Sequence, residues 1–263
     1  MYQQYSAKPV IVIKILFFSL SLAFVATLGF ASCNFKTGNF IDELGDPSYI
    51  DEIDINVPMS AKWAKNFLRI ATSPSKNIPL ALKKSFSAEV FVHYSFGTCT
   101  YFGKVKQNGD WKDHISFLNG EPVRSLNVTL KSGNVLNSVK FKLLLPETRN
   151  DLSEVFGVTL LNILGFITPE TFKVPVTVNG IKADMLFQES SSKELLERNY
   201  RREGPIFEGD ETLLWGYGRL KNDDVSLSRL INDNWFIKGD SSASITLKSF
   251  QKLQAAYILF SKN

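Results

Sequence analysis

The sequence is poor in the side chains that most often carry metal or nucleophilic chemistry. Its 263 residues include two cysteines and two histidines. Cys33 and Cys99 are too few for a disulfide framework or a cysteine-based metal site within one chain, although they could pair in an oxidising compartment. His93 and His114 lie in separate strand-like segments, without the one-turn spacing of a helical metal site. The chain also lacks a Gly-x-Ser-x-Gly motif, so a hydrolase of the Ser-His-Asp type is not expected.

A strong charge of one sign is also missing. The chain has 30 basic and 26 acidic residues, for a net charge of +4, and this excess is too small to indicate nucleic-acid binding. No aromatic-rich strand of the kind found in RNA-binding domains is evident, so no nucleic-acid partner is expected. The hydrophobic fraction of 44% and the charged fraction of 21% are typical of a folded domain with a sizeable core.

A long apolar run near the N-terminus is the main indication of location. Lys8 and Lys14 precede an uncharged stretch from Ile15 to Cys33, which is long enough to cross a bilayer as a helix. A basic start, an apolar centre and small residues at the end are also typical of a secretory signal. We therefore expect residues 1–33 to be a signal peptide or membrane anchor. The protein would then be exported, and either membrane-anchored or periplasmic in the cell envelope.

The end of this run leaves the form of export open. Cleavage after Ala31 fits a secretory signal. Residues 30–33, with the sequence FASC, also resemble the site at which bacterial lipoproteins are lipidated, although Phe is a poor first residue there. If Cys33 is lipidated or removed, Cys99 remains alone, and we expect it to be a small buried hydrophobic side chain.

The segment that follows the apolar run is acidic and rich in turn residues. We expect residues 34–59 to be a solvated linker and residues 60–263 to form one α+β domain. A helix is predicted at the start of this domain, because apolar residues recur at helical spacing after Ser60. Ser60 is the expected N-cap, and Pro74 follows the expected end.

Strand signals then dominate from Ser87 to Leu145. Short runs of β-branched and aromatic residues are separated by Asn-Gly and Ser-Gly pairs, which predicts antiparallel strands. The apolar period then changes to that of helices. We therefore predict an antiparallel β-rich domain with packed helices. The later elements are a helix over 151–164 capped by Asn150 or Asp151 and ended by Gly165, a hairpin turning at Asn179-Gly180, a short charged helix over 190–198, and a final amphipathic helix.

One glycine-rich segment deserves comparison with phosphate-binding loops. Residues 97–104 read GTCTYFGK. Five residues separate the two glycines instead of four, Val105 stands where a Ser or Thr would hold magnesium, and the segment is strand-like. These differences exclude a Walker motif. A glycine-containing turn over a nucleotide remains open.

A strand lysine and a helix glutamate indicate a different kind of phosphate site. Lys142 lies in the strand-like run KFKLLL, and Glu154 lies in the first turn of the next predicted helix. Kinases hold ATP phosphates with a strand lysine that a helix glutamate orients. Lys142 and Glu154 are therefore candidate nucleotide-binding residues, and Lys112 is a rival for the phosphate-holding role. The alternative is that the lysines of this strand are solvated positions at a sheet edge.

A series of short motifs continues from this strand. A helix with an acidic start ends in Leu-Gly, and a strand, an Asn-Gly hairpin, a strand ending in Glu, a helix and a strand ending in Gly-Asp follow. The positions are Asp151, Leu164-Gly165, Asn179-Gly180, Glu189 and Gly209-Asp210. This order resembles the CotH-like (spore-coat protein H) family of atypical kinases. The resemblance implies a kinase small lobe with Glu189 at the hinge beside adenine. It also implies ATP and Mg²⁺ as cofactors and phosphoryl transfer to a secreted or surface protein.

The chain departs from that family in its C-terminal part. Family members keep their metal-binding and catalytic aspartates in a larger second lobe, whereas residues 212–263 offer four aspartates in no assignable arrangement: Asp223, Asp224, Asp233 and Asp240. Kinase chemistry needs a positioned base and carboxylates for magnesium. We therefore expect a truncated relative with weak phosphoryl transfer or none. The alternative is a non-catalytic cell-envelope binding or structural module.

Overall fold

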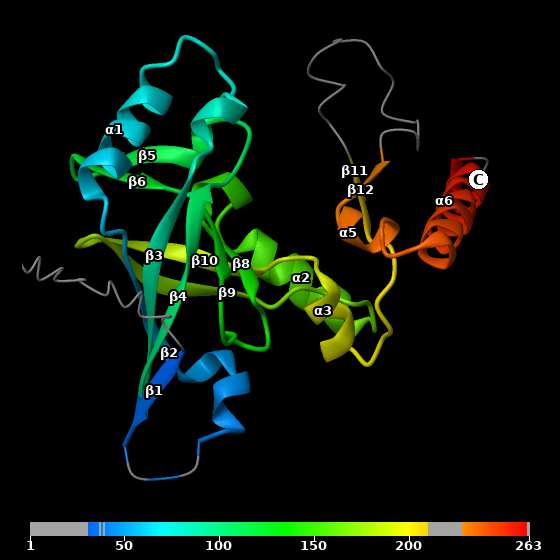
Figure 1. Ribbon diagram of the computed structural model, residues 1–263, viewed down its shortest axis with the longest axis horizontal. Coiled ribbons are helices and arrows are strands. Elements are labelled where there is room, and N and C mark those ends of the chain that lie inside the picture. The colour runs from blue at the N-terminus through cyan, green and yellow to red at the C-terminus, as the bar shows by residue number, and fades with distance from the viewer. Residues whose placement is uncertain (1–30, 37, 39, 210–227, 262–263) are drawn as a thin grey trace, which may run out of the picture.

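The protein is built around one large β-sheet (Figure 1). The computed structural model describes residues 31–36, 38, 40–209 and 228–261. Eight strands form the sheet in the order β1-β4-β3-β2-β9-β10-β8-β7, and β4 also pairs with β7. The sheet therefore closes on itself from β4 round to β7. The eight strands are β1 Ser32–Phe35, β2 Ile50–Asn56, β3 Ser85–Tyr94, β4 Gly97–Gln107, β7 Leu126–Leu130, β8 Lys140–Leu144, β9 Thr171–Val178 and β10 Ile181–Glu189.

The remaining elements are short strands and helices. Two small hairpin sheets pair β5 Ile115–Leu118 with β6 Glu121–Arg124 and β11 Phe207–Gly209 with β12 Ser228–Leu230. The helices are α1 Ser60–Ala71, α2 Ser153–Ile163, α3 Lys193–Arg198, α5 Asp233–Phe236 and α6 Asp240–Ser261. The described residues also contain five 3₁₀ turns: η1 Glu43–Gly45, η2 Pro47–Tyr49, η3 Leu80–Leu82, η4 Lys112–His114 and η5 Pro146–Arg149. The expectation of a β-rich α+β protein is confirmed.

The core lies inside the closed sheet, because side chains on successive strand positions alternate between its two faces. In β3, every second residue from Phe86 to Tyr94 is buried. The inward residues of the other strands join them in one cluster, which includes Phe141, Val176 and Phe187. All pairings in the large sheet are antiparallel except that of β2 with β9, which is parallel.

The acidic segment expected to be a linker contains a central strand instead. β2 lies between β3 and β9, and its Ile53 and Ile55 are 0% and 2% exposed. From Glu52 to Ile55, acidic residues alternate with isoleucines. Glu52 and Asp54 therefore point outward while the isoleucines fill the core, an arrangement that composition alone does not distinguish from a solvated linker.

The first predicted helix is confirmed as α1. Its Trp63, Phe67 and Ile70 are buried along one side, as its apolar spacing predicts. The predicted cap is wrong: Met59 is the N-cap residue and Ser60 is the first helical residue. Ser60 therefore lies inside the helix.

The second predicted helix forms, but it does not pack as expected. α2 buries none of its side chains, and Phe156 and Ile163 are 71% and 75% exposed. Neither Asn150 nor Asp151 caps it, since both have positive φ and the N-cap residue is Leu152. The helix ends as predicted. Gly165, at φ +83°, donates its N–H to Asn162 O, and Phe166 donates to Leu161 O, which is the Schellman arrangement.

The Asn179-Gly180 hairpin joins β9 and β10 as predicted. Both turn residues have positive φ, 48° and 86°, as a type I′ turn requires. Asn179 Oδ1 also accepts the N–H of Val57 at 2.7 Å, so the turn is tied to the end of β2. The charged helix α3 and the final helix α6 also form, and the C-terminal elements from β11 to α6 lie apart from the large sheet (Figure 1).

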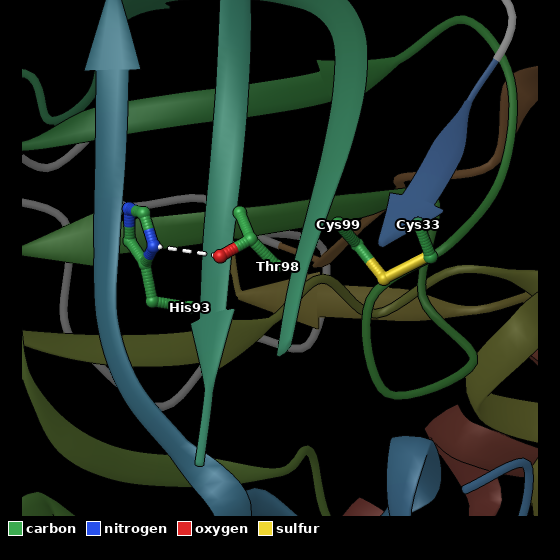
Figure 2. Close-up of a disulfide and its surroundings, with 4 residues drawn as sticks. All are labelled: Cys33, His93, Thr98 and Cys99. Atoms are coloured by element: carbon green, nitrogen blue, oxygen red, sulfur yellow. Dashed lines mark hydrogen bonds between the residues drawn. A yellow bond between two sulfur atoms is a disulfide. The ribbon is translucent and has the colours of Figure 1, made fainter. Parts of the chain in front are cut away.

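The two cysteines form a disulfide between β1 and β4 (Figure 2). Cys33 stands directly opposite Cys99 in the strand register, and Cys99 is completely buried. The sulfur of Cys33 is thereby taken, which excludes the thioether of a lipidated cysteine in this state. Of the expected segment 1–33, residues 1–30 lie outside the described residues, and its end is part of β1. Among the helices that the structure describes, none is long and apolar enough to span a membrane.

Candidate functional site

Lys142 lies on the outer face of the closed sheet. It sits in the middle of β8, between Phe141 and Leu143, whose side chains belong to the core. β8 pairs with β10 on one side and β7 on the other. Lys142 is therefore on an interior strand, so the expectation of a sheet edge is wrong, although Lys140 at the start of the same strand is exposed.

The surroundings of Lys142 disfavour its positive charge. Its pKa lies below the ordinary value, first because the side chain is largely buried and second because Arg149 is near. Glu208 and Glu154 act in the opposite direction, but more weakly. Among the described residues, no carboxylate comes within the 4.0 Å of an ion pair with Lys142. Within the described residues, the site therefore holds two neighbouring cations, Lys142 and Arg149, without a directly bound anion.

Glu154 reaches the same face of the sheet but binds a different partner. Its Oε1 accepts a hydrogen bond from Gln188 Nε2 at 2.7 Å, and Gln188 stands opposite Lys142 in the pairing of β10 with β8. The structure thus brings the predicted lysine and glutamate together through Gln188. It does not join them in the direct ion pair that the kinase pattern predicts.

The start of α2 adds a second attraction for anions. The N-cap residue Leu152 has no side chain that could accept the first free amides, and the N-terminus of a helix favours negative charge. Arg149 ends η5 beside it, and its Nε is buried without a hydrogen-bond partner among the described residues. An open depression of about 400 Å³ lies here, bordered by residues of η5 and the first turn of α2 from Glu147 to Glu154.

Glu189 is occupied by structural interactions. Its carboxylate is 0% exposed, pairs with Arg198 Nη2 at 2.6 Å and accepts Ser138 Oγ at 2.9 Å. Its N–H donates to Glu170 O at 2.9 Å. This N–H is therefore not available to an adenine, which limits the hinge role implied by the family resemblance.

Lys112 is also used elsewhere. Its ammonium donates to the carbonyl oxygens of Ala71, at 3.1 Å, and Ser73. These carbonyls belong to the last residue of α1 and the turn after it, where free carbonyls attract cations. The structure thus gives Lys112 a capping role and leaves Lys142 as the candidate for holding phosphates.

The sequence does not single out two members of the site, Arg149 and Gln188. A basic residue just before a helix start opposes the helix dipole, so the position of Arg149 is the one sequence signal for its role. Gln188 gives no such signal. It matters because strand pairing puts it opposite Lys142, and this pairing is not visible in the sequence.

His93 forms a second polar cluster with Asp54 and Thr98. Its ring nitrogens lie 3.0 Å from Asp54 Oδ2 and 3.1 Å from Thr98 Oγ1, and Figure 2 shows the contact with Thr98. The residue types are those of a nucleophilic triad. However, Thr98 stands directly opposite His93 in the sheet, and the side chains of His93 and Asp54 are 37% and 39% exposed. Cross-strand pairing on an open surface explains the cluster.

The C-terminal aspartates, for which the sequence suggests no metal-binding arrangement, lie partly outside the described residues. Asp210, Asp223 and Asp224 lie there, whereas Asp233 and Asp240 are in α5 and at the start of α6. Within the described residues, no three His, Cys, Asp or Glu side chains are grouped so that they could hold a metal ion.

Comparison with known proteins adds no family to this picture: no family model matches the chain, and no curated protein matches it.

Proposed function

We propose that this protein is an exported kinase-like module that binds the phosphates of ATP at Lys142, with weak phosphoryl transfer or none. The observation that carries the proposal is the pair of cations formed by Lys142 and Arg149. Burial and mutual repulsion both disfavour the charge on Lys142, and a phosphate bound between the two side chains would relieve both.

The neighbouring groups suit this ligand. The uncapped start of α2 would add backbone N–H donors to the phosphate oxygens. Gln188 and Glu154 are hydrogen-bonded to each other at 2.7 Å, and Gln188 stands opposite Lys142 in the pairing of β10 with β8. Mg²⁺, bound with ATP, would offset phosphate charge. If transfer occurs, the acceptor is a secreted or surface protein.

An exported location is part of the proposal. The disulfide between Cys33 and Cys99 supports it, because such bonds persist mainly in oxidising compartments. The apolar run before Cys33 supports it too, as a signal or anchor that would bring the protein to a membrane.

The test is a thermal unfolding experiment on the full chain with ATP and with Mg-ATP. Binding at 100 times Kd should raise the unfolding free energy by about 2.7 kcal/mol. The Lys142→Met variant should lose this increase. It should also be slightly more stable without nucleotide, by up to about 1 kcal/mol, because an unpaired buried charge is removed at similar volume.

The matched control is Lys104→Met, at an exposed position of β4 in the same sheet. This variant should keep the response to ATP. If the folded wild-type protein shows no response, or if Lys142→Met responds like wild type, the nucleotide proposal fails. If the wild-type protein does respond to ATP, incubation with labelled ATP measures autophosphorylation.

One observation favours the second candidate function, a non-catalytic cell-envelope binding or structural module. α2 and its C-cap residue Leu164 expose a large apolar surface, since Phe156, Ile163 and Leu164 are all more than half exposed. Exposed apolar patches often mark interaction surfaces. A folded protein without any ATP response would leave this candidate ahead.

A further inference from the structure

A pocket lies on the inner face of the closed sheet, opposite to the outer face that carries Lys142. Neither proposed function involves this pocket. It has a volume of about 170 Å³ and lies between α1, β6 and the β9–β10 hairpin. Its walls are mainly apolar, from Trp63, Phe67, Val176, Ala183 and Met185. Ala183 and Met185 are on the core face of β10, whereas Gln188 is on its outer face with Lys142. The pocket and the phosphate site are therefore separate.

Arg124, at the end of β6, is the charged residue in the pocket lining. It is only 6% exposed. Its Nη1 donates to Asn66 Oδ1 at 3.2 Å and its Nη2 donates to Trp63 O at 3.0 Å. The guanidinium carbon also lies 3.6 Å from the centroid of the Trp63 ring. All three partners are neutral.

The charge of Arg124 is therefore buried without a counter-ion. Among the described residues, no carboxylate lies within the 4.0 Å of an ion pair with it. Burial lowers the pKa of Arg124 to about 9, so the side chain is still cationic at neutral pH. The two hydrogen bonds use two of the five N–H donors that a guanidinium carries. A buried arginine without an acid costs free energy unless another anion completes its interactions.

The contacts of Arg124 with α1 could by themselves be a structural tie between α1 and β6. Such a tie does not account for the open pocket next to it. The exposed residues Ser60 and Ala64 line this pocket, so it is accessible from solvent beside α1. A buried cation at the wall of an accessible apolar pocket is the arrangement that fixes the orientation of an amphipathic ligand.

We propose that this pocket binds a small organic carboxylate whose apolar part is a single ring or a short branched chain. A cavity of about 150 Å³ with apolar walls holds benzene, so the size suits one ring. The planar guanidinium suits a carboxylate, which it can bind through two parallel hydrogen bonds. The ring would pack against Val176, Ala183 and Met185, and the carboxylate would face Arg124.

The test uses 3-phenylpropionate and its neutral counterpart 3-phenylpropan-1-ol, titrated into the full chain by calorimetry and by NMR. The acid should bind at least tenfold more tightly than the alcohol, because only the acid pairs with Arg124. Equal binding of both would show an apolar cavity without recognition of the anion and would overturn the proposal. So would the absence of binding by the acid at millimolar concentration to folded protein.

Two variants and one control connect binding to this pocket. Ala64→Phe places a ring at the opening and should weaken binding of the acid at least tenfold, whereas Ala61→Phe, at an exposed position of α1 that does not line the pocket, should leave it unchanged. Arg124→Met should remove the preference for the acid over the alcohol, if it folds. Ala64→Phe keeps Arg124 in place, so the test remains decisive even if the Arg124→Met variant does not fold. If Ala64→Phe binds the acid like wild type, the site is elsewhere and the proposal fails. The response to ATP should be the same in Ala64→Phe and wild type.

Discussion

At the scale of single residues, Glu189 shows how one buried side chain can hold several segments together. Its carboxylate binds Arg198 of α3, Ser138 before β8 and the N–H of Glu170 before β9. The sequence marks Glu189 as the end of a strand and, through a family resemblance, as a hinge residue. It does not indicate the structural role, because that role depends on where α3 brings Arg198.

Glu189 and Glu170 both pair with Arg198, but we expect them to contribute differently to the free energy of unfolding. Glu189→Gln should lower the unfolding free energy by about 3 kcal/mol, because it leaves Arg198 without its fully buried counter-ion. Glu170→Gln should cost less than about 1 kcal/mol, since the Glu170 side chain is 35% exposed and solvent screens its pairing. Urea unfolding of both variants measures the difference. Equal losses would show that Arg198 gains no more from the buried partner than from the exposed one.

Single residues of the sequence predict part of the candidate phosphate site. The strand lysine and the helix glutamate are recognisable by spacing, and Lys142 and Glu154 do reach one face of the sheet. Their separation by Gln188 was not predictable, because it depends on the register between β8 and β10. Register follows from the packing of whole strands, not from the residues near Lys142.

At the scale of elements, local signals identified most helices and strands. The Asn179-Gly180 turn is the clearest case, since only a few residue types accept positive φ at both turn positions. β2 was not predicted for an equally local reason. Its acidic residues give the segment the composition of a solvated linker, although its isoleucines face the core. The disulfide depends on β1, which pairs with β4 through only four positions.

The disulfide should make a large contribution to stability, because it joins residues separated by 66 positions in the chain. Loop-closure entropy predicts a gain of about 4 kcal/mol for a loop of this length. The double variant Cys33→Ser/Cys99→Ser should therefore unfold at lower urea concentration, and reduction of the wild-type protein should have the same effect. Thiol titration should find no free thiol before reduction. An unchanged midpoint after complete reduction would contradict the prediction.

At the scale of the whole molecule, the closure of the sheet is the feature that the sequence does not reveal. Closure requires β4 to pair with β3 along one edge and with β7 along the other, where β1 also pairs with a separate part of β4. The alternating patterns of these strands fit an open sheet equally well. Contacts of this kind are set by which arrangement buries the most apolar surface, and that is a property of all the strands together.

The position of each helix in the whole molecule explains why α1 is partly buried and α2 is not, although both carry many apolar residues. α1 has a buried side that includes Ile70 at 0% exposed, whereas α2 has no buried side chain. Changes on α2 should therefore cost little. Phe156→Lys and Ile163→Lys should each alter the unfolding free energy by no more than about 0.5 kcal/mol and should raise solubility, because each removes exposed apolar surface.

Ile70→Lys in α1 is the control for these variants and should lower the unfolding free energy by more than about 3 kcal/mol, because it buries a charge in the core. Urea unfolding and solubility measurements on the full chain test all three changes. A loss at Phe156 or Ile163 as large as that at Ile70 would mean that another part of the chain covers α2. The apolar surface of α2 would then belong to the core of the folded protein, and the observation that favours a non-catalytic interaction module would no longer support it.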